Sequence, residues 1–414
     1  MSRRAAAAGS QSSLREANRV LVVETVKRYG GLTQVELATA TGLSQATVST
    51  IVRELLAAGV VDTASTTRSG RRAQMVTLAR RVGLAVGVHI GHRHLRVVLG
   101  DFTHEVIAEQ TLPLPAEHRV DTSLDRVALL VVDLLERVGA TLDDVVGLGV
   151  GVPVPVDSST GLLSVRGLMP GWDDVHVGQV LSKRLGLPVY VDNDANLGAI
   201  AESTLGASRQ HSDSVYVRVS HGVGAGIVIG GHLHRGAGGA AGTIGHVPVQ
   251  FPGDPCRCGN AGCLDTVVGA PALFERLRTS HGTLALRDVV QRTRDGDERC
   301  AQVVAEAGVA IGRVVAGLGA TVDPQVVVVG GELADTGEVL LGPLRAAARR
   351  TVVLNRFVPL EVVPAALGSR AEVVGALALA LRSTDVPLRV DVDLDTDVDS
   401  GTDDDVGPAT AGLA

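Results

Sequence analysis

One histidine and three cysteines, placed within 18 residues of each other, form the part of the sequence with the clearest chemical signature. They are His246, Cys256, Cys258 and Cys263. One imidazole and three thiolates suit a tetrahedral, closed zinc site, and the intervening glycines let the chain fold back around an ion. The alternative is a loop that buries three free thiols. We predict a structural Zn2+ site in a zinc loop at about 246–263, with no open position for catalysis.

Composition restricts the class of protein. The 414 residues are 45% hydrophobic and 20% charged, which indicates a globular chain of two or three domains with a sizeable core. The fourth cysteine, Cys300, is predicted to be a small core residue, and four cysteines make no disulfide scaffold. We find no apolar run of about 18 residues and no secretory h-region, so we expect a cytoplasmic protein without a membrane partner. Aromatic residues, at 2%, exclude an extensive stacking surface for single-stranded nucleic acid.

The net charge of −7 conceals three segments of different charge. Residues 1–80 carry +6, residues 81–382 carry −5 and residues 383–414 carry −8. Because counterion release depends on local charge, the overall value does not argue against DNA binding. We expect a disordered N-terminus (1–11), a DNA-binding module (12–80), an α/β body (81–382) and an acidic disordered tail (383–414).

The basic module has the pattern of a winged helix-turn-helix. Helices are predicted over 12–28, 34–40 and 45–58, with a tight turn at Gly42 between the last two. A capping box, Thr33-x-x-Glu36, opens the second helix. Two short helices joined by a glycine-containing turn are typical of this DNA-binding motif.

The third predicted helix has one apolar and one polar face. Its apolar face carries Val48, Ile51, Val52 and Leu55 at helical spacing. Its other face, with the capping turn, supplies the residues that we expect to approach DNA: Ser44, Gln45, Ala46, Thr47, Ser49, Thr50 and Arg53. A following hairpin places Arg68, Arg71 and Arg72 at its tip, where a wing could contact phosphates or the minor groove. The alternative is a three-helix interaction module whose charges are solvated.

The body alternates apolar strands with helices, which predicts an α/β fold. The predicted strands cover 84–88, 95–99, 145–152, 188–191, 215–219, 227–229 and 326–329, and a helix covers 122–138. The first two strands are expected to form a hairpin. The strands at 215–219 and 227–229 are expected to flank a glycine-rich turn.

Several motifs of the body, taken together, closely resemble the signature of the ROK family, which comprises repressors, open reading frames and sugar kinases. They are Val219-x-x-Gly222-Val223-Gly224-x-Gly226-Ile227 with Gly236, Gly242 and Gly245-His246, the zinc loop, Asn193-Asp194-Ala195-Asn196, and the stretch VVVGGEL at 327–333. With the N-terminal module, the chain resembles the transcriptional repressor branch of this family over about residues 12–382. The resemblance implies a winged helix-turn-helix followed by a two-lobed, actin-like (hexokinase-like) ROK domain.

The chain departs from the family's kinases where these bind Mg-ATP. Their first phosphate loop resembles D-x-G-G-T, but this chain has His89-Ile90-Gly91-His92-Arg93. Their second loop resembles G-T-G-x-G, and here it is Gly222-Val223-Gly224-Ala225-Gly226. The changes in the two loops remove a metal-orienting acid and two hydroxyls. They also place a bulky side chain where the kinase backbone must approach the phosphate. We predict no kinase activity; the alternative is an ATP-dependent sugar kinase with a DNA-binding head.

The resemblance also assigns candidate effector-binding residues in the cleft, namely Asn193, Asp194, Thr243, His246 and Asp265. Asn193 and Asp194 keep the family pattern, and Asp194 matches the base of the kinases. Thr243 and Asp265 stand where the family has glutamates, and Val154 stands where it has a glycine. We predict a changed sugar or sugar-phosphate site. In the alternative there is no sugar effector, His246 serves zinc alone, and Asn193 and Asp194 cap the next helix.

Together these features predict a bacterial, cytoplasmic transcriptional regulator, a repressor of carbohydrate-related genes. It is expected to bind double-stranded operator DNA as a homodimer or homotetramer, and to associate with the nucleoid through that DNA. The acidic tail is predicted to be solvated, and the alternative is that it competes with DNA for the basic module.

Overall fold

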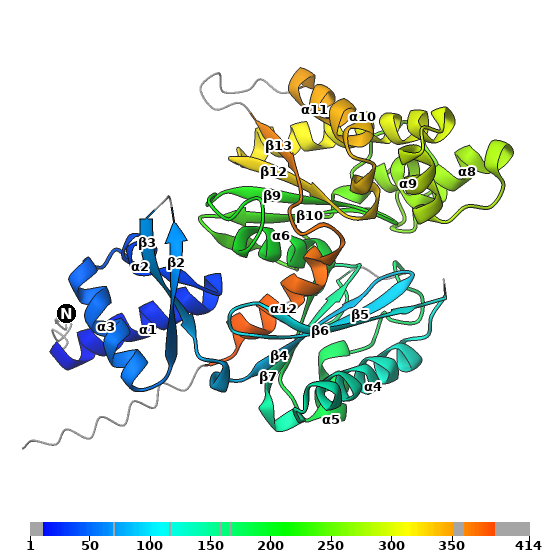
Figure 1. Cartoon of the computed structure of the whole chain (residues 1–414). Helices are drawn as coiled ribbons and strands as arrows, with labels where there is room; N and C mark the ends of the chain where they lie inside the picture. Colours follow the sequence, from blue (N-terminus) through cyan, green and yellow to red (C-terminus); the bar gives the residue numbers. More distant parts are fainter. Residues whose placement is uncertain are drawn as a thin grey trace, which may run out of the picture.

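The computed structural model describes residues 11–68, 71–115, 117–157, 159–164, 167–351 and 360–385. These residues form three parts, which Figure 1 shows as a small N-terminal unit beside two larger α/β units. We call residues 11–78 the head. Lobe I is the sheet formed by residues 84–193 with its helices, and lobe II is the sheet formed by residues 214–364 with its helices.

The head is a winged helix-turn-helix. It consists of α1 (Gln11–Tyr29), β1 (Leu32–Thr33), α2 (Gln34–Thr41), α3 (Gln45–Ala57), β2 (Val61–Arg68) and β3 (Arg71–Leu78), with sheet order β1-β3-β2. The predicted Thr33/Glu36 capping box is present, and Gly42 ends α2 in the left-handed conformation at a φ of 71°. The four predicted apolar residues of α3 are all buried. Local caps and helical periodicity therefore predicted the head correctly.

The two lobes contain sheets of the same topology. In lobe I the order is β6-β5-β4-β7-β8, with strands β4 (Leu84–Ile90), β5 (His94–Asp101), β6 (Val106–Pro113), β7 (Val145–Val152) and β8 (Val189–Asn193). In lobe II the order is β11-β10-β9-β12-β13, with β9 (Ser214–Val219), β10 (Val223–Ile229), β11 (His232–His234), β12 (Val326–Gly330) and β13 (Glu361–Pro364). In each sheet three antiparallel strands are followed by two parallel ones.

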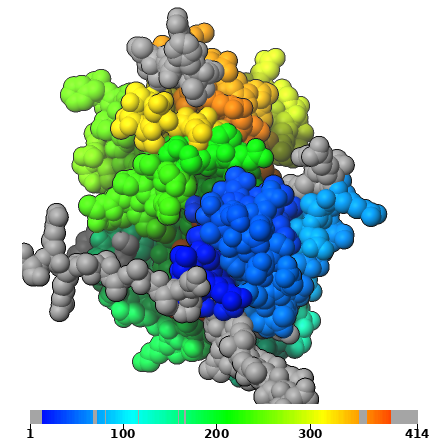
Figure 2. Space-filling view, turned by 90° about the vertical axis from the view of Figure 1, so that its left-hand side faces the viewer, coloured from blue at the N-terminus to red at the C-terminus, as the bar shows by residue number. Residues whose placement is uncertain are grey.

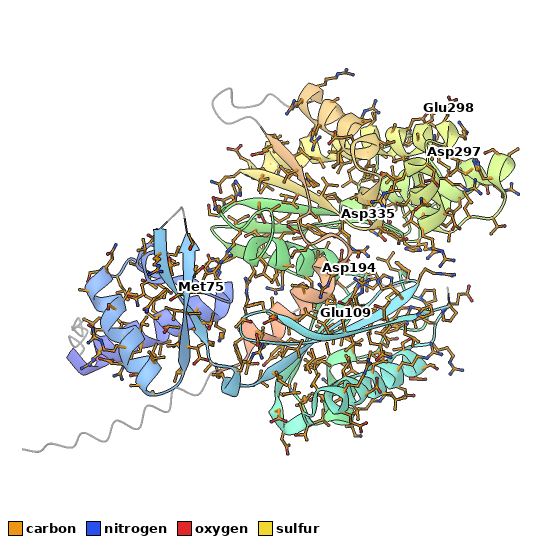
Figure 3. All side chains as sticks on the ribbon, in the orientation of Figure 1. Met75, Glu109, Asp194, Asp297, Glu298 and Asp335 are labelled. Atoms are coloured by element: carbon orange, nitrogen blue, oxygen red, sulfur yellow. The ribbon has the colours of Figure 1, made fainter. Side chains whose placement is uncertain are left out.

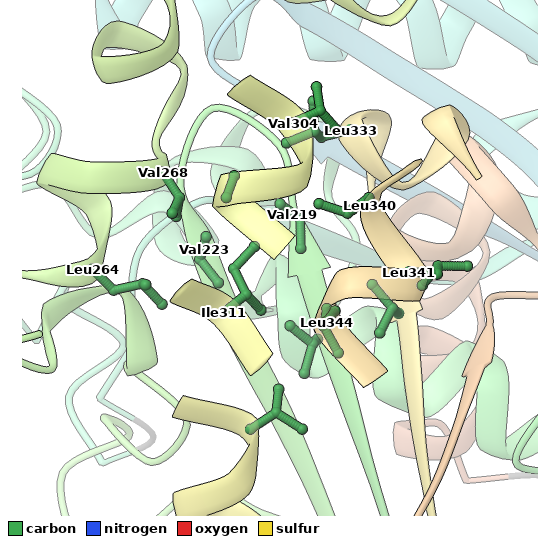
Figure 4. Close-up of a cluster of buried hydrophobic side chains, with 14 of the residues drawn as sticks. Val219, Val223, Leu264, Val268, Val304, Ile311, Leu333, Leu340, Leu341 and Leu344 are labelled. Atoms are coloured by element: carbon green, nitrogen blue, oxygen red, sulfur yellow. The ribbon is translucent and has the colours of Figure 1, made fainter. Parts of the chain in front are cut away.

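Helices cover the sheets and bury their apolar faces. Lobe I has α4 (Val120–Val138) and α5 (Val177–Leu185), and lobe II has α7 (Leu264–Val268), α8 (Ala270–His281), α9 (Leu286–Arg294), α10 (Glu298–Val322) and α11 (Glu338–Thr351). Short 3-10 turns lie at Arg80–Val82, Leu142–Asp144, Ile244–His246, Glu332–Thr336 and Gly368–Arg370. Figure 4 shows the core of lobe II, where Val219 and Val223 of the sheet meet Ile311 of α10 and Leu344 of α11.

Helix α10 is long and apolar enough, by length and composition alone, to cross a membrane. Half of its most apolar window is buried inside the protein, and its buried face belongs to the core of lobe II. Burial in this core accounts for the apolar composition of the helix.

Two helices cross between the lobes. Helix α6 (Asp194–Thr204) continues from β8 of lobe I but packs on β9 and β10 of lobe II. Helix α12 (Ala371–Ser383) follows β13 of lobe II but packs on β4 and β7 of lobe I, and the two helices pack on each other. Figure 1 shows α12 between the sheets with its C-terminal end toward the head.

Glycines permit the close packing of α12. A Cβ atom at Gly149 of β7 would lie 1.9 Å from the carbonyl oxygen of Ala376, and one at Gly375 would lie 1.9 Å from that of Leu197 in α6. Backbone therefore contacts backbone on both sides of α12. This contact fixes the distance between the crossing helices more tightly than side-chain packing would.

Three sequence predictions need correction. The glycine-rich turn after β9 is short, because β10 begins at Val223 and pairs Gly224 and Gly226 with β9. Gly226 instead allows α6 to approach the sheet, since a Cβ there would lie 2.4 Å from the carbonyl oxygen of Ala195.

The N-terminal segment predicted as 1–11 ends one residue earlier, because α1 begins at Gln11. The tail predicted as 383–414 begins later, because α12 includes Ser383. Residues 1–10 and 386–414 lie outside the described part of the chain.

Substitution of Gly375 by alanine is expected to lower the free energy of unfolding by about 1–3 kcal/mol, because α6 and α12 would have to separate. The measurement is thermal or denaturant unfolding of the full chain. Gly317→Ala in α10 is the matched control, because its added methyl group meets nothing within 4 Å. That control is expected to be neutral or slightly stabilising. Equal effects of the two substitutions would contradict the proposed contact.

Candidate functional site

The exposed face of α3 carries the residues predicted to approach DNA. Ser44, Gln45, Ala46, Thr50 and Arg53 are exposed, and Thr47 and Ser49 are half-buried. The Ser44 hydroxyl accepts a hydrogen bond from the Thr47 amide at 3.1 Å, so it caps the helix as well. The Thr50 hydroxyl donates to the carbonyl of Ala46 at 3.0 Å, so its oxygen can still accept a hydrogen bond.

The wing lies beside this face. Strands β2 and β3 pair along their whole length, and Arg72 is exposed near the tip. The side chains of Arg68 and Arg71 lie outside the described residues. The structure therefore brings together the helix and the hairpin that the sequence predicted for DNA contact.

The end of α1 joins the head to the rest of the molecule. The Lys27 ammonium is buried and donates to Glu24 at 2.7 Å and to the carbonyl of Thr384, just beyond α12, at 2.9 Å. His104, in the β5–β6 turn of lobe I, lies with Nε2 3.0 Å from the carbonyl oxygen of Lys27. Arg28 donates to the carbonyl of Gly231 in lobe II. Figure 2 shows the head, in blue, packed against green segments of lobe II.

Five consecutive residues of the head, Lys27–Gly31, contact both lobes and the crossing helix α12. Arg209, in the segment between α6 and β9, donates to the carbonyl of Gly31 at 3.2 Å, and Arg382 of α12 donates to that of Arg28 at 3.3 Å. A relative movement of the lobes would therefore act on α1 directly. No sequence pattern indicated this junction, because its partners are distant along the chain.

A cleft of about 940 Å³ separates the lobes. The five predicted effector-binding residues all line it: Asn193, Asp194, Thr243, His246 and Asp265. Figure 3 shows Asp194 between the two sheets, where α6 begins. The predicted residues therefore converge, although they come from separate segments.

Several of these side chains also have structural partners. The Asn193 side-chain oxygen accepts from the Ala195 amide at 3.0 Å and caps α6, the role given above as the alternative. An Asp265 oxygen accepts from the Val223 amide at 2.8 Å, and burial raises the pKa of this carboxyl. The Thr243 hydroxyl donates to the carbonyl of Ala240. The cleft is thus lined with polar groups that local hydrogen bonds orient.

A buried ionic group lies at the base of the cleft. Arg218 of β9 places Nη1 3.3 Å from Oδ2 of Asp194 and donates from Nε to Glu372 of α12 at 2.9 Å. Burial alone would raise the pKa of Asp194, but Arg218 and His89 hold it below its usual value. Arg218 and Glu372 were not predicted as functional residues. The available signal was an arginine inside the otherwise apolar strand VYVRV.

Histidines continue this group into lobe I. His89 at the end of β4 has Nε2 3.6 Å from Oδ2 of Asp194, and its Nδ1 lies 3.3 Å from Nε2 of His94. His89 is 2% exposed, so its ring fills the place where the kinase pattern has an acid. His94 lines the cleft. Burial is the main cause that lowers the pKa of His94 to about 3, and the neighbouring His89 is the next.

The predicted metal ligands lie together. His246 Nδ1 is 3.4 Å from the Cys256 sulfur, and the sulfurs of Cys258 and Cys263 are 3.7 Å apart. All four ligand atoms lie within 4.8 Å of one another. Four ligands about 2.0–2.3 Å from a tetrahedral ion would be roughly 3.5–3.8 Å apart, so this donor set fits such an ion. His246 belongs both to this cluster and to the cleft lining.

A second group, His281, Asp297 and Cys300, also has its potential ligand atoms within 4.8 Å of one another. Asp297 caps α10 by accepting from the Cys300 amide at 2.8 Å, and it pairs with His281 at 2.8 Å. Cys300 is fully buried in the core of lobe II, as the sequence predicted. These contacts are those of a capped helix end.

Comparison with known proteins gives one family match to the head and another to the region that contains both lobes. The family model described as the ROK family matches residues 85–383, and that described as the MarR family matches residues 17–72. The chain is 28% identical over 393 residues to the xylose repressor of Caldicellulosiruptor bescii, covering 90% of this chain and 97% of that protein. It is 29% identical over 391 residues to the DNA-binding transcriptional dual regulator NagC of Escherichia coli, covering 91% and 95%.

Solved structures match the same regions. A ROK family glucokinase from Streptomyces griseus, in complex with glucose and AMPPNP, is 28% identical with a TM-score of 0.65, covering 72% of this chain and 99% of that one. A ROK family transcriptional regulator, a homologue of the E. coli Mlc protein, has a TM-score of 0.70 at 24% identity, covering 89% of this chain and 97% of that one. The latter match shows that the winged-helix and two-lobed arrangement is shared.

Cys258→Ser is expected to remove bound metal from the purified protein, because it replaces one of four converging donors by a weak ligand. Metal content per chain, measured by mass spectrometry of the elements, checks this. Cys300→Ala is the matched control and is expected to keep the metal. Retention of a full metal equivalent by Cys258→Ser would show that the cluster is not the binding site.

Proposed function

This chain belongs to the ROK family, and we propose that it is a DNA-binding transcriptional repressor of carbohydrate-related genes whose cleft binds a sugar or sugar derivative. The observation that carries this proposal is the joining of a winged-helix head to both lobes at the end of α1. Relatives named as a xylose repressor and as NagC match nearly the whole chain, head included, which supports a role in regulation.

The head would read operator DNA with α3 in the major groove and the wing on the backbone. Small and polar side chains at Ala46, Ser49 and Thr50 allow close approach to base edges, and Arg53 supplies charge. A winged-helix repressor acts on a two-fold operator as a symmetric assembly, so we propose a homodimer or homotetramer. The remaining assignments are those of the sequence: a DNA-binding domain and an α/β domain that meet at residues 80 and 81, a cytoplasmic location, and association with the nucleoid through DNA.

Ligand binding would act on the head through the lobes. A ligand can shift a conformational equilibrium only when its affinity for the two states differs, and a cleft between two lobes provides that difference on closure. The crossing helix α12 contacts lobe I along its length and the head at its end. Closure would therefore change the position of one head relative to its partner in the assembly.

The ion held by His246, Cys256, Cys258 and Cys263 is proposed to be Zn2+. Three sulfur donors and one nitrogen favour zinc over magnesium or calcium, which prefer oxygen ligands. With all four positions filled by protein, the ion would stabilise the loop and supply no catalysis. Through His246 it would also fix one wall of the cleft.

We propose that the cleft does not transfer phosphate. His89 is buried beside Asp194 in the position of the kinase acid, and the hydroxyls of both phosphate loops are absent. The likeness to a glucokinase and the retained Asp194 favour the rival function, a sugar kinase with a DNA-binding head.

Arg53→Ala is expected to weaken DNA binding at least about fivefold, because it removes a positive charge from the recognition helix. The assay is fluorescence anisotropy on a duplex that the wild-type chain selects from a random library. Arg313→Ala, an equal charge change on the exposed face of α10, is the control and is expected to leave the affinity unchanged. If both variants bind as the wild type does, α3 is not the recognition helix.

A coupled assay for ADP is expected to show no turnover with ATP, Mg2+ and a panel of monosaccharides, because the phosphate loops lack the required groups. The Streptomyces griseus glucokinase is the positive control for glucose. Sugar-dependent release of ADP that Asp194→Asn abolishes would instead establish the kinase function.

A further inference from the structure

A groove runs along the outer edge of lobe I and shares no lining residue with the cleft between the lobes. It has a volume of about 710 Å³, and four consecutive residues of β8 line it, Val189–Asp192. Its other walls include Gly178 and Lys183 of α5, and Leu379 and Ser383 of α12. Because β8 is the last strand in the order of its sheet, the groove gives access to a sheet edge.

The backbone of this edge has unused pairing capacity. The amide of Leu148 in β7 donates to the carbonyl of Pro188 at 2.9 Å, and Leu148 lies opposite Val189 in the ladder. In a parallel ladder, alternate residues direct their amide and carbonyl groups to the same neighbour. Val189 and Val191 therefore direct theirs away from β7, and such an edge can accept a further strand.

The side chains of this edge are incompletely covered. Val189, Tyr190 and Val191 are all half-buried. Val189 and Val191 pack on the core of lobe I, while the Tyr190 hydroxyl donates to the carbonyl of Ser383 at 3.0 Å. Native proteins usually protect a sheet edge with charge, proline or a covering segment. Three adjacent apolar residues at an open edge therefore indicate that another segment covers them.

The chain itself has a segment of suitable pattern that begins at this groove. Ser383 lines the groove, and the Thr384 hydroxyl donates to the carbonyl of Val146 in β7 at 3.4 Å. The described part of the chain ends one residue later, beside the first residues of β7 and β8. The sequence then continues with Val386 and Pro387 and, over 388–394, reads LRVDVDL. Strict alternation of apolar and polar residues is typical of a strand with one covered face.

We propose that residues 388–394 occupy this groove as a sixth strand of lobe I, parallel to β8. The segment starts where β8 starts, and its seven residues are enough to pair with the five of β8. Its apolar residues would lie beside Val189 and Val191. A slip of one residue would place aspartates there instead, so the alternation sets the register.

This position would give the tail a structural role next to the cleft. Strand β8 leads directly into Asn193 and Asp194, which line the cleft. The added strand would therefore hold the lobe I side of the cleft in place. Only the residues that follow this segment would then be solvated, in contrast to the sequence prediction for the whole tail.

Hydrogen–deuterium exchange, measured by mass spectrometry on peptides that contain Val189 and Val191, tests this proposal. The full chain is compared with a chain that ends at Asp385 and lacks the segment. The two valine amides are expected to exchange about tenfold or more slowly in the full chain, because hydrogen bonding protects them. A chain that ends at Asp395 is the matched control. It keeps residues 388–394 and is expected to exchange as the full chain does.

A second pair of variants keeps the length of the chain. Val390→Asp with Val392→Asp removes the apolar face and is expected to speed exchange at the two valine amides of β8 as much as truncation does. Asp391→Asn with Asp393→Asn changes the opposite face and is expected to keep their protection. Unchanged exchange in β12, in the core of lobe II, checks that each variant remains folded.

Equal exchange at Val189 and Val191 in the full chain and in the chain that ends at Asp385 would overturn the proposal. Loss of protection in the chain that ends at Asp395 would also overturn it, because the segment is still present there. Protection that declines as the full chain is diluted would assign the groove to the tail of a second copy. Equal exchange combined with tighter DNA binding by the chain that ends at Asp385 would place the tail on the head instead.

Discussion

A single buried guanidinium links the sheet of lobe II to both crossing helices. Arg218 extends from the sheet of lobe II and is paired with Asp194 at the start of α6 and Glu372 at the start of α12. Burial alone would lower the pKa of Arg218, but the two carboxylates raise it, so its charge is retained. Because an unpaired buried charge is very unfavourable, these three residues must stay together whenever the protein is folded. The base of the cleft and both crossing helices are therefore held at one point.

Beyond the Arg218 ion pairs, direct backbone contacts set the position of α12. Helix α12 approaches lobe I at Gly149 and α6 at Gly375 with no side chain between them. Its far end reaches the head through Arg382 and Thr384. A close-packed helix of this kind would move as a rigid body, so in the regulation proposed above a change at the Glu372 end would be carried to the other end. The DNA-binding head thus depends on the relative position of two lobes that it also contacts directly.

His246 connects the cluster of Cys256, Cys258 and Cys263 to the cleft. Its Nδ1 faces the Cys256 sulfur, while the residue also lines the cleft, as Thr243 and Asp265 do. On the lobe I side, His89 and His94 extend the ionic group across the cleft. The groups that line the cleft are therefore held by contacts outside it. The shape of the cleft depends on how far apart the two lobes lie.

The sequence by itself determined the local features: the capping box at Thr33, the apolar face of α3, the central strands of each lobe and the convergence of the four metal ligands. These depend on periodicity, capping and short-range spacing, which are properties of neighbouring residues. Only the tertiary structure decided the Arg218 ion pairs and the joining of Lys27 to the end of α12. The Lys27–Thr384 and Arg218–Glu372 partners are more than a hundred residues apart in the sequence, and Asp194 lies on a different element from Arg218, so no local rule relates them. The glycines show the same limit: Gly226 was predicted in a turn, but the structure places it in a strand because α6, packed from another part of the chain, needs the space.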